Sequence, residues 1–326
     1  MKTLVTGGGG FLGSHIVSRL IEERRSIRVF GRTPRPELED LGVEVVCGDL
    51  TNANDCRRAV AGCDVVHHVA SLAGVWGKAK IYERTNVEGC FHLLEAAKRE
   101  EVKAFIYTSS PSVIFDGQDH HLSDETLAYP KSYLCHYPRT KAIAERMVLA
   151  CHEPDGMKTL SLRPHLFWGK GDPHLVPRIL ERARTGKLRQ IGPGGNKVHM
   201  VHVKNAAHAH LLAEKALIQK SEAGGKAYFI TDQKPVDLWL WIQNLLAAKN
   251  IPWDPRPISS EMAYGVGSCL ELLFKAFFLP GEPPMTRFVA RQLSTSHTYD
   301  TSLAQNLLGY EPIVTMEQGM QELLEH

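Results

Sequence analysis

The stretch TGGGGFLG, residues 6–13, lies between an apolar run at 2–6 and an amphipathic pattern at 11–24. Gly7 suits a tight turn, Gly10 lets the backbone approach a pyrophosphate, and Gly13 lets the following helix pack closely on the sheet. The start of that helix offers free N–H groups and a positive dipole end to the phosphates. A glycine-rich loop between a strand and a helix therefore predicts a dinucleotide site, with contacts from Gly7, Gly10, Phe11, Leu12 and Gly13.

The residues that follow alternate short apolar runs with helical patterns. We predict strands at 2–6, 27–31, 43–47, 64–70, 104–110 and 158–164, and helices at 11–24, 86–100 and 137–152. The strands are almost continuously apolar, as expected when helices cover both faces of a parallel sheet. Alternating strands and helices indicate βαβ units. The predicted fold class is α/β, a Rossmann-type doubly wound parallel sheet with a smaller, mostly helical C-terminal substrate lobe.

After Pro164 the regular alternation of strand and helix patterns weakens, so we place a domain boundary there. We assign 1–164 to the dinucleotide-binding domain and 165–326 to the substrate-binding lobe. A strand at 197–203, a helix at 205–217 and a strand at 226–232 suggest that 197–232 returns to the first domain. From about residue 235 the chain reads as helices and loops broken by proline.

Composition excludes several classes of protein. The net charge of +2 and the lack of a basic tract argue against a nucleic-acid partner. Seven cysteines without a Cys-x-x-Cys pair argue against a disulfide framework or structural zinc, and favour a reducing cytoplasm. The sixteen histidines lack the spacing of a zinc helix, so we expect no metal. The N-terminal residues have no apolar segment of signal-peptide length.

The end of the second strand indicates which dinucleotide binds. An acid at this point would accept hydrogen bonds from the ribose of NAD, but Gly31 stands there and Arg32 follows. An arginine pairs well with a 2′-phosphate, so the sequence predicts NADP(H). Arg35 is a second candidate, although a loop arginine is more often solvated. Asp49, after the third strand, either faces the adenine or serves as a turn carboxylate.

The segment CHYPRTKAIAER, residues 135–146, places Tyr137 and Lys141 one helical turn apart. This spacing arises easily by chance and is also compatible with an ordinary helix start. Pro138 is tolerated in a first turn, so the helix should begin at about Tyr137.

With these residues assembled, the chain resembles an extended short-chain dehydrogenase/reductase over essentially its whole length. The resemblance rests on seven motifs in the family's order: TGGGGFLG, GDL, HHVAS, TNVEG, YTSSPSV, YPRTK and LRPHLFWG. Within the family it is similar to the 3β-hydroxysteroid dehydrogenase-like branch, which includes sterol-4α-carboxylate decarboxylating dehydrogenases. The stretches 71–77, 174–192, 224–230 and 280–297 look closest to the 2-alkyl-3-oxoalkanoate reductase of bacterial olefin biosynthesis.

The resemblance implies a Ser–Tyr–Lys catalytic site, which carries over to Ser110, Tyr137 and Lys141. Ser109 and Ser112 rank below Ser110, and Asn86 matches an asparagine that orders the site. The further cofactor contacts that we assign are Asp49, Leu50, Ala70, Pro164 and Leu166, together with Tyr137 and Lys141.

The implied activity is NADPH-dependent reduction of a long-chain 2-alkyl-3-keto acid to the 2-alkyl-3-hydroxy acid. The alternative is a 3β-hydroxysteroid or sterol dehydrogenase. A sugar-nucleotide epimerase-like activity and a non-catalytic cofactor-sensing regulator are disfavoured. The expected partners are an apolar small-molecule substrate and a second copy of the chain as a homodimer.

The segment 267–280 places Leu270, Leu273, Phe274 and Phe277 on one helical face, and Glu271 with Lys275 on another. It is either ordinary packing, a cover for an apolar substrate, or a surface for a pathway-enzyme assembly or peripheral membrane contact.

Overall fold

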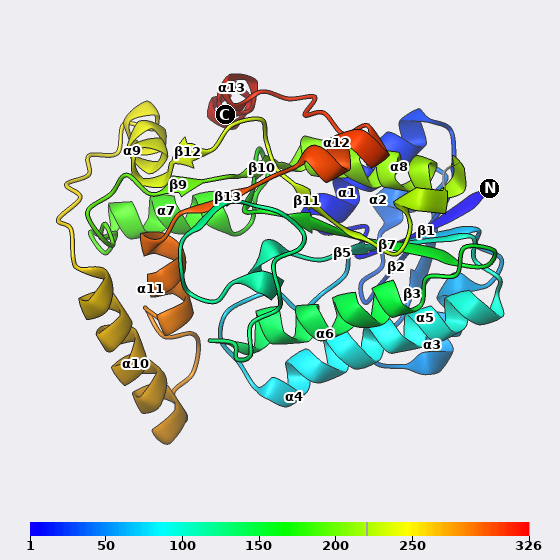
Figure 1. Ribbon diagram of the computed structural model, residues 1–326, viewed down its shortest axis with the longest axis horizontal. Helices are drawn as coiled ribbons and strands as arrows, with labels where there is room; N and C mark the ends of the chain where they lie inside the picture. The colour runs from blue at the N-terminus through cyan, green and yellow to red at the C-terminus, as the bar shows by residue number, and fades with distance from the viewer. Residues whose placement is uncertain (220, 326) are drawn as a thin grey trace.

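The computed structural model describes residues 1–219 and 221–325 and centres on a seven-stranded parallel sheet (Figure 1). The sheet has the order β11-β7-β5-β4-β1-β2-β3. Its strands are β1 (Lys2–Thr6), β2 (Ser26–Gly31), β3 (Glu44–Cys47), β4 (Val65–His68), β5 (Ala104–Thr108), β7 (Lys158–Pro164) and β11 (Ala227–Ile230). The order reverses on either side of β1, which pairs with both β2 and β4. A crevice at the carboxyl ends of the strands is expected at this switch point.

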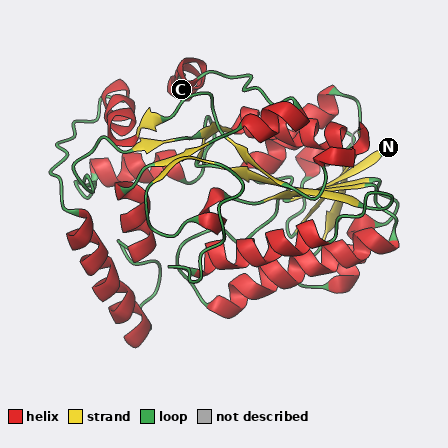
Figure 2. Ribbon diagram, viewed as in Figure 1, coloured by secondary structure: helices red, strands yellow, loops and turns green. Residues whose placement is uncertain are grey.

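Helices cover both faces of this sheet (Figure 2). One face carries α1 (Phe11–Glu22), α8 (Val203–Gln219) and α12 (Ser302–Leu308), while the other carries α3 (Ala53–Val60), α5 (Gly89–Arg99) and α6 (His136–Ala150). Successive residues of β1 serve the two apolar cores, because Val5 packs toward α1 and Leu4 toward α3 and α5. The predicted Rossmann-type doubly wound fold is confirmed.

A second region holds a smaller sheet and most of the C-terminal helices. Its four-stranded sheet has the order β12-β9-β13-β6, formed by β6 (His120–Ser123), β9 (Lys197–Val198), β12 (Val236–Asp237) and β13 (His297–Tyr299). Around it lie α7 (Leu175–Arg184), α9 (Leu238–Ala248), α10 (Ser260–Ala276), α11 (Arg287–Ser294) and α13 (Met316–Leu324). Trp168, Trp239 and Trp241 are buried in the apolar core of this region.

The single strand predicted at 197–203 is wrong. The segment forms β9 and then β10 (Val201–His202), and α8 begins at Val203. β9 pairs within the small sheet, whereas β10 pairs with β8 (Phe167–Trp168). The chain changes partners between the two strands, and the His199 N–H donates to the His297 carbonyl at 2.9 Å. Continuous apolar character cannot reveal such a change of partner.

Helix α10 packs through a face that the sequence did not single out. Its buried residues are Ala263, Gly267 and Glu271. Glu271 does not pair with Lys275 as its spacing suggested. Its carboxylate instead accepts from the backbone N–H and the Nε of Arg287, both at 2.8 Å.

The predicted apolar stripe of α10 is not internal packing. Leu273 is 45% exposed and Phe277 is 69% exposed. Phe274 meets the Trp76 ring edge to face, with the ring centroids 6.3 Å apart. None of the described helices combines the length and the apolar character needed to cross a membrane. Contact of this stripe with a membrane or a partner enzyme stays a prediction.

Two glycines of α10 provide a matched test of how this helix is attached. In Gly267→Ala the new Cβ would lie 2.7 Å from the carbonyl carbon of Thr286, so the variant should lose roughly 1–3 kcal/mol of stability. In Gly265→Ala no described atom lies within 4 Å of the new Cβ, so the better helix propensity should add up to about 1 kcal/mol. Denaturant unfolding measures both, and shifts of the same sign would contradict this packing.

Candidate active site

A cavity of about 1400 Å³ runs from the glycine loop to helices α7, α10 and α11. This exceeds the usual size of a small-molecule pocket and leaves room for a dinucleotide beside a substrate. The cavity wall brings together residues far apart in the sequence, from Gly7 to His297. The active site is therefore shared by the large sheet and the second region.

The glycine loop forms one end of this cavity. Gly7 adopts a left-handed φ of +69°, as its tight turn requires. A Cβ on Gly13 would lie 2.1 Å from the Gly7 carbonyl oxygen, so the close approach made by Gly13 is to the loop itself. Gly8 faces the sheet, because its Cβ would lie 2.6 Å from Val29. Close packing around the glycine loop therefore depends on Gly7, Gly8 and Gly13, and not on Gly13 alone.

Helix α1 begins directly after Gly10, which caps it without a side chain. The first N–H groups of a helix lack intrahelical acceptors, and here Gly10, Phe11, Leu12 and Gly13 line the cavity. The first turn carries no acid that would repel an anion. This end of the cavity fits a pyrophosphate, in agreement with the predicted cofactor contacts.

The end of β2 supplies two arginines to the cavity wall. Gly31 ends the strand, and among the described residues no atom lies within 4 Å of where its Cβ would be. Arg32 lines the cavity, and so does Arg35, whose Nη2 lies 3.4 Å from the Gly9 carbonyl oxygen. The sequence ranked Arg35 low as a loop residue. Only the folded loop shows that Arg35 lies across the glycine turn.

Asp49 and Leu50 also line this end of the cavity. Asp49 accepts a hydrogen bond from the Thr51 N–H at 2.8 Å. This bond, and more weakly the charge of Arg32, lower the pKa of the Asp49 carboxyl. Asp49 is thus a turn carboxylate, one of the two predicted alternatives, and it also lines the cavity; contact with an adenine stays a prediction. Ala70 reaches the wall through packing against Gly7, at 3.0 Å from the position of a Cβ there.

Tyr137 enters the cavity from the first turn of α6, which begins at His136 as the sequence predicted to within one residue. Pro138 is the third helical residue, where an N–H is not needed. Desolvation raises the pKa of the Tyr137 hydroxyl to about 12, and its hydrogen bond with Ser110 opposes this shift. At neutral pH Tyr137 therefore carries a proton that it can donate.

Lys141 lies one turn after Tyr137 and is almost completely buried. Its Nζ donates to the carbonyl oxygen of Thr108 at the end of β5 and lies 4.2 Å from the centre of the Tyr107 ring. Burial lowers the pKa of the Lys141 ammonium to about 8. The group therefore remains mostly charged at pH 7, although its positive charge is costly at this position.

Asn86 connects the loop after β4 to helix α6. It is buried in a π-helical segment, Glu83–Glu88, of the kind that often marks functional sites. Its Oδ1 accepts from the Leu72 N–H at 2.7 Å, and its Nδ2 donates to the Leu72 carbonyl and to Thr140 Oγ1, both at 3.1 Å. Asn86 thus positions the residue next to Lys141.

The residues after β7 form the floor of the cavity. Leu166 lines it with a left-handed φ of +47°, a conformation that leucine rarely adopts. Two predicted residues are not part of the wall that the described residues form. Pro164 is paired with Ile230 of β11, and the Ser110 hydroxyl accepts from the Ser112 N–H at 3.2 Å. Of the three serines, Ser109 lines the cavity, but it is the Ser110 hydroxyl that lowers the pKa of Tyr137.

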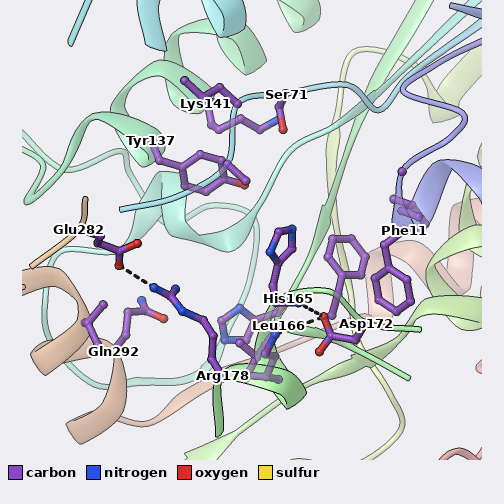
Figure 3. A pocket seen from close by; sticks show the side chains of 18 of the residues that line it. Phe11, Ser71, Tyr137, Lys141, His165, Leu166, Asp172, Arg178, Glu282 and Gln292 are labelled. Carbon is purple, nitrogen blue, oxygen red and sulfur yellow. Dashed lines mark hydrogen bonds and ion pairs between the residues drawn. The ribbon is translucent and has the colours of Figure 1, made fainter. Parts of the chain in front are cut away.

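The far end of the cavity is apolar, and of its wall the sequence analysis had singled out only Leu270, in the segment considered as a cover for an apolar substrate. Its wall includes Leu175 and Ile179 of α7, Val266 and Leu270 of α10, and Val289 and Leu293 of α11. One ion pair also lies there, between Arg178 and Glu282 at 2.9 Å (Figure 3). The sequence analysis assigned no helix to 175–184, so it could not place α7 at the cavity.

This chain has clear relatives among known protein families. The sequence profile of the 3-beta hydroxysteroid dehydrogenase/isomerase family matches residues 4–255. The chain belongs to this family. Its members include oxidoreductases, and the predicted recognition as an extended short-chain dehydrogenase/reductase of the 3β-hydroxysteroid dehydrogenase-like branch is confirmed.

Individual relatives cover almost the whole chain. The 2-alkyl-3-oxoalkanoate reductase of Shewanella oneidensis is 42% identical over 98% of this chain and 84% of that protein. The decarboxylating sterol-4-alpha-carboxylate 3-dehydrogenase of Mus musculus is 33% identical over 99% of this chain and 90% of that protein. The UDP-glucose 4-epimerase of Thermotoga maritima superposes with a TM-score of 0.77 at 22% identity, covering 100% of this chain and 98% of that one. This last likeness concerns the fold alone.

The family and the geometry agree on a nicotinamide-dependent oxidoreductase. The glycine loop, the free N–H groups of α1 and the Tyr137–Lys141 pair lie along one cavity. These residues fit a nicotinamide dinucleotide with its phosphates at α1 and its reactive end near Tyr137.

The buried charge of Lys141 predicts a stability cost that depends on pH. Its pKa is about 8 in the fold against 10.5 ordinarily, so between these values the unfolded chain binds more protons and stability rises with pH. Lys141→Met should therefore stabilise the cofactor-free protein by about 1–3 kcal/mol below pH 8 and abolish most turnover. The stability advantage should shrink toward pH 10.5.

Lys103→Met is the matched control, because Lys103 is 67% exposed and pairs with Asp64 at the surface. Its effect on unfolding free energy should stay small at every pH. A Lys141→Met difference that does not change between pH 8 and 10.5 would contradict the lowered pKa.

Proposed function

We propose that this protein reduces the keto group of a long-chain 2-alkyl-3-keto acid with NADPH, yielding the 2-alkyl-3-hydroxy acid. The observation that carries the proposal is the single cavity that joins a dinucleotide loop, the Tyr137–Lys141 pair and an apolar end. The 42% identity to a 2-alkyl-3-oxoalkanoate reductase supports the same substrate class.

The residues of the site have complementary roles in this reaction. When bound, the nicotinamide cofactor supplies the hydride that reduces the carbonyl carbon. Tyr137 donates its proton to the carbonyl oxygen, and Ser110 hydrogen-bonds the same oxygen. The positive charge of Lys141 stabilises the phenolate that remains. Proton donation by a positioned group of this kind contributes roughly 10²–10⁴-fold to the rate.

The preference for NADPH rests on charge at the end of β2. Gly31 brings no carboxylate to repel a 2′-phosphate, and Arg32 and Arg35 both line the cavity beside the glycine loop. An arginine beside a phosphate forms charge-assisted hydrogen bonds, which are roughly twice as strong as neutral ones.

The alternative function is a 3β-hydroxysteroid or sterol dehydrogenase, which the family and the 33% identical mouse relative support. The two relatives' names share one chemical feature. A 2-alkyl-3-oxo acid and a sterol-4α-carboxylate both carry a carboxyl group on the carbon next to the reacting carbon. The apolar end of the cavity suits either the alkyl chains or a sterol.

Substitutions that change the charge at positions 31 and 32 test the preference for NADPH over NADH. The wild type should prefer NADPH over NADH by roughly 10–150-fold in kcat/KM, as one charged hydrogen bond predicts. Gly31→Asp with Arg32→Ala should reverse this order. Gly31→Asn is the control, because it adds the same bulk without charge and should keep NADPH preferred. Equal kcat/KM for the two cofactors in the wild type would refute the proposal.

A substrate series tests the reaction itself. Oxidation of 2-alkyl-3-hydroxy acids with NADP⁺ avoids the spontaneous decarboxylation of 3-keto acids. Each buried methylene contributes about 0.8 kcal/mol, so kcat/KM should rise up to roughly fourfold per methylene until the cavity is filled. Tyr137→Phe should bind NADPH normally and lose about 10²-fold or more of the rate. A flat dependence on chain length with a clear preference for a hydroxysteroid would favour the alternative.

A further inference from the structure

Two arginines of α7 hold one segment across the cavity. Arg178 Nη2 lies 2.9 Å from Glu282 Oε1, and Arg182 Nη2 donates to the Pro284 carbonyl oxygen at 2.7 Å. The arginines are four residues apart and so lie on one helical face. The segment they hold, residues 282–286 between α10 and α11, lines the cavity throughout.

The Arg178–Glu282 pair lines the same cavity as Tyr137 and Lys141. Asp172 fixes the start of α7 by accepting from the N–H groups of His174, Leu175 and Val176 at 2.7–3.2 Å. Arg178 is therefore in the first turn, and Arg182 lies four residues farther, about 6 Å along the axis. Figure 3 shows Arg178 and Glu282 in the same part of the cavity as Tyr137.

Glu282 also lies near the start of α6. Burial, and more weakly the charge of Glu282, raise the pKa of the Tyr82 hydroxyl to about 12. The Tyr82 ring lies against His136, the first residue of α6, with the ring centroids 6.1 Å apart. Glu282 and Tyr137 line the same cavity.

Arg178 can leave Glu282 for another carboxylate with little loss of protein stability. The side chains of Arg178 and Glu282 are 54% and 33% exposed, and ion pairs in contact with water contribute little to stability. A guanidinium has five donors in a planar fork that matches a carboxylate with two parallel hydrogen bonds. Glu282 is the only acidic partner within salt-bridge distance of Arg178 among the described residues.

We propose that Arg178 recognises the carboxylate of the substrate, and that Glu282 occupies Arg178 until the substrate arrives. The proposal rests on the proposed function, since it requires an acid substrate. Binding exchanges one carboxylate for another, so Arg178 stays paired while Glu282 turns to solvent. A neutral ketone of the same apolar area leaves the pair intact and gains no ionic contact, so Arg178 selects acids over neutral ketones.

Other cations of this region are less well placed. Arg182 is engaged with the Pro284 carbonyl oxygen. Lys187 and Arg189 line the cavity but follow the end of α7 at Arg184, two turns or more beyond Arg178. A carboxyl group on the carbon next to the reacting carbon must lie close to Tyr137, which favours the cation nearest the start of α7.

A pair of substrates that differ only in charge tests this assignment. The probes are a long-chain 2-alkyl-3-hydroxy acid and its methyl ester, each oxidised with NADP⁺ by the full-length protein. Arg178→Met should lower kcat/KM for the acid by roughly 10–100-fold, mainly through KM, and should lower it far less for the ester. Arg178→Lys should recover part of the loss. Arg182→Met is the control and should change acid and ester alike.

Glu282→Gln gives a prediction of opposite sign. Without the competing carboxylate, KM for the acid should fall while KM for the ester stays the same. Equal losses on acid and ester in Arg178→Met, with NADPH binding intact, would overturn the role of Arg178 and leave the proposed function standing. A wild type that oxidises a hydroxysteroid but neither acid nor ester would overturn both. A higher KM for the acid in Glu282→Gln would overturn the exchange.

Discussion

Helix α6 is held on the sheet by buried charges, and the geometry of the active site depends on this attachment. Lys141 donates to the Thr108 carbonyl at the end of β5, while Glu145, one turn later, accepts from Arg163 of β7 at 2.7 Å. All three side chains are at most 2% exposed. Removing Glu145 or Arg163 alone would leave the other as an uncompensated buried charge, which is strongly destabilising. The two attachments keep α6 in one position across two neighbouring strands, and Tyr137 therefore has a defined place at the carboxyl end of the sheet.

The same buried groups hold the active site in place and also carry an energetic cost. Burial works against the ammonium of Lys141 and against the phenolate of Tyr137, and their pKa values move apart, to about 8 and about 12. The protein keeps a charged lysine beside a protonated tyrosine at neutral pH, an arrangement suited to proton donation. Asn86 and the left-handed Leu166 add further local constraint around the same cavity. Costly local arrangements of this kind persist where the surrounding fold determines them.

Much of the fold could be predicted because its signals are local. The strand, the glycine loop and the helix at the N-terminus are adjacent in sequence, and so are Tyr137, Pro138 and Lys141. Predictions failed where a residue's environment is set by a distant partner. The segment 197–203 divides because β9 and β10 pair with different strands. Glu271 bonds Arg287 and not Lys275, and the partly exposed Arg35 also contacts the Gly9 carbonyl. Pro164 carries the right motif but pairs with β11, so its neighbours form the cavity wall.

The sequence by itself determined the strands β1–β5 and β7 of the large sheet, the glycine loop with its bare helix start, and the Tyr137–Lys141 spacing, because each depends on residues within a few turns of one another. The tertiary structure alone decided which side chains enclose the substrate. Arg178 and Glu282 are 2.9 Å apart although 104 positions separate them in the chain. No periodicity links α7 to the segment before α11. Their contact arises because both elements pack around the same apolar core of the second region, and packing of this kind is a property of the whole chain.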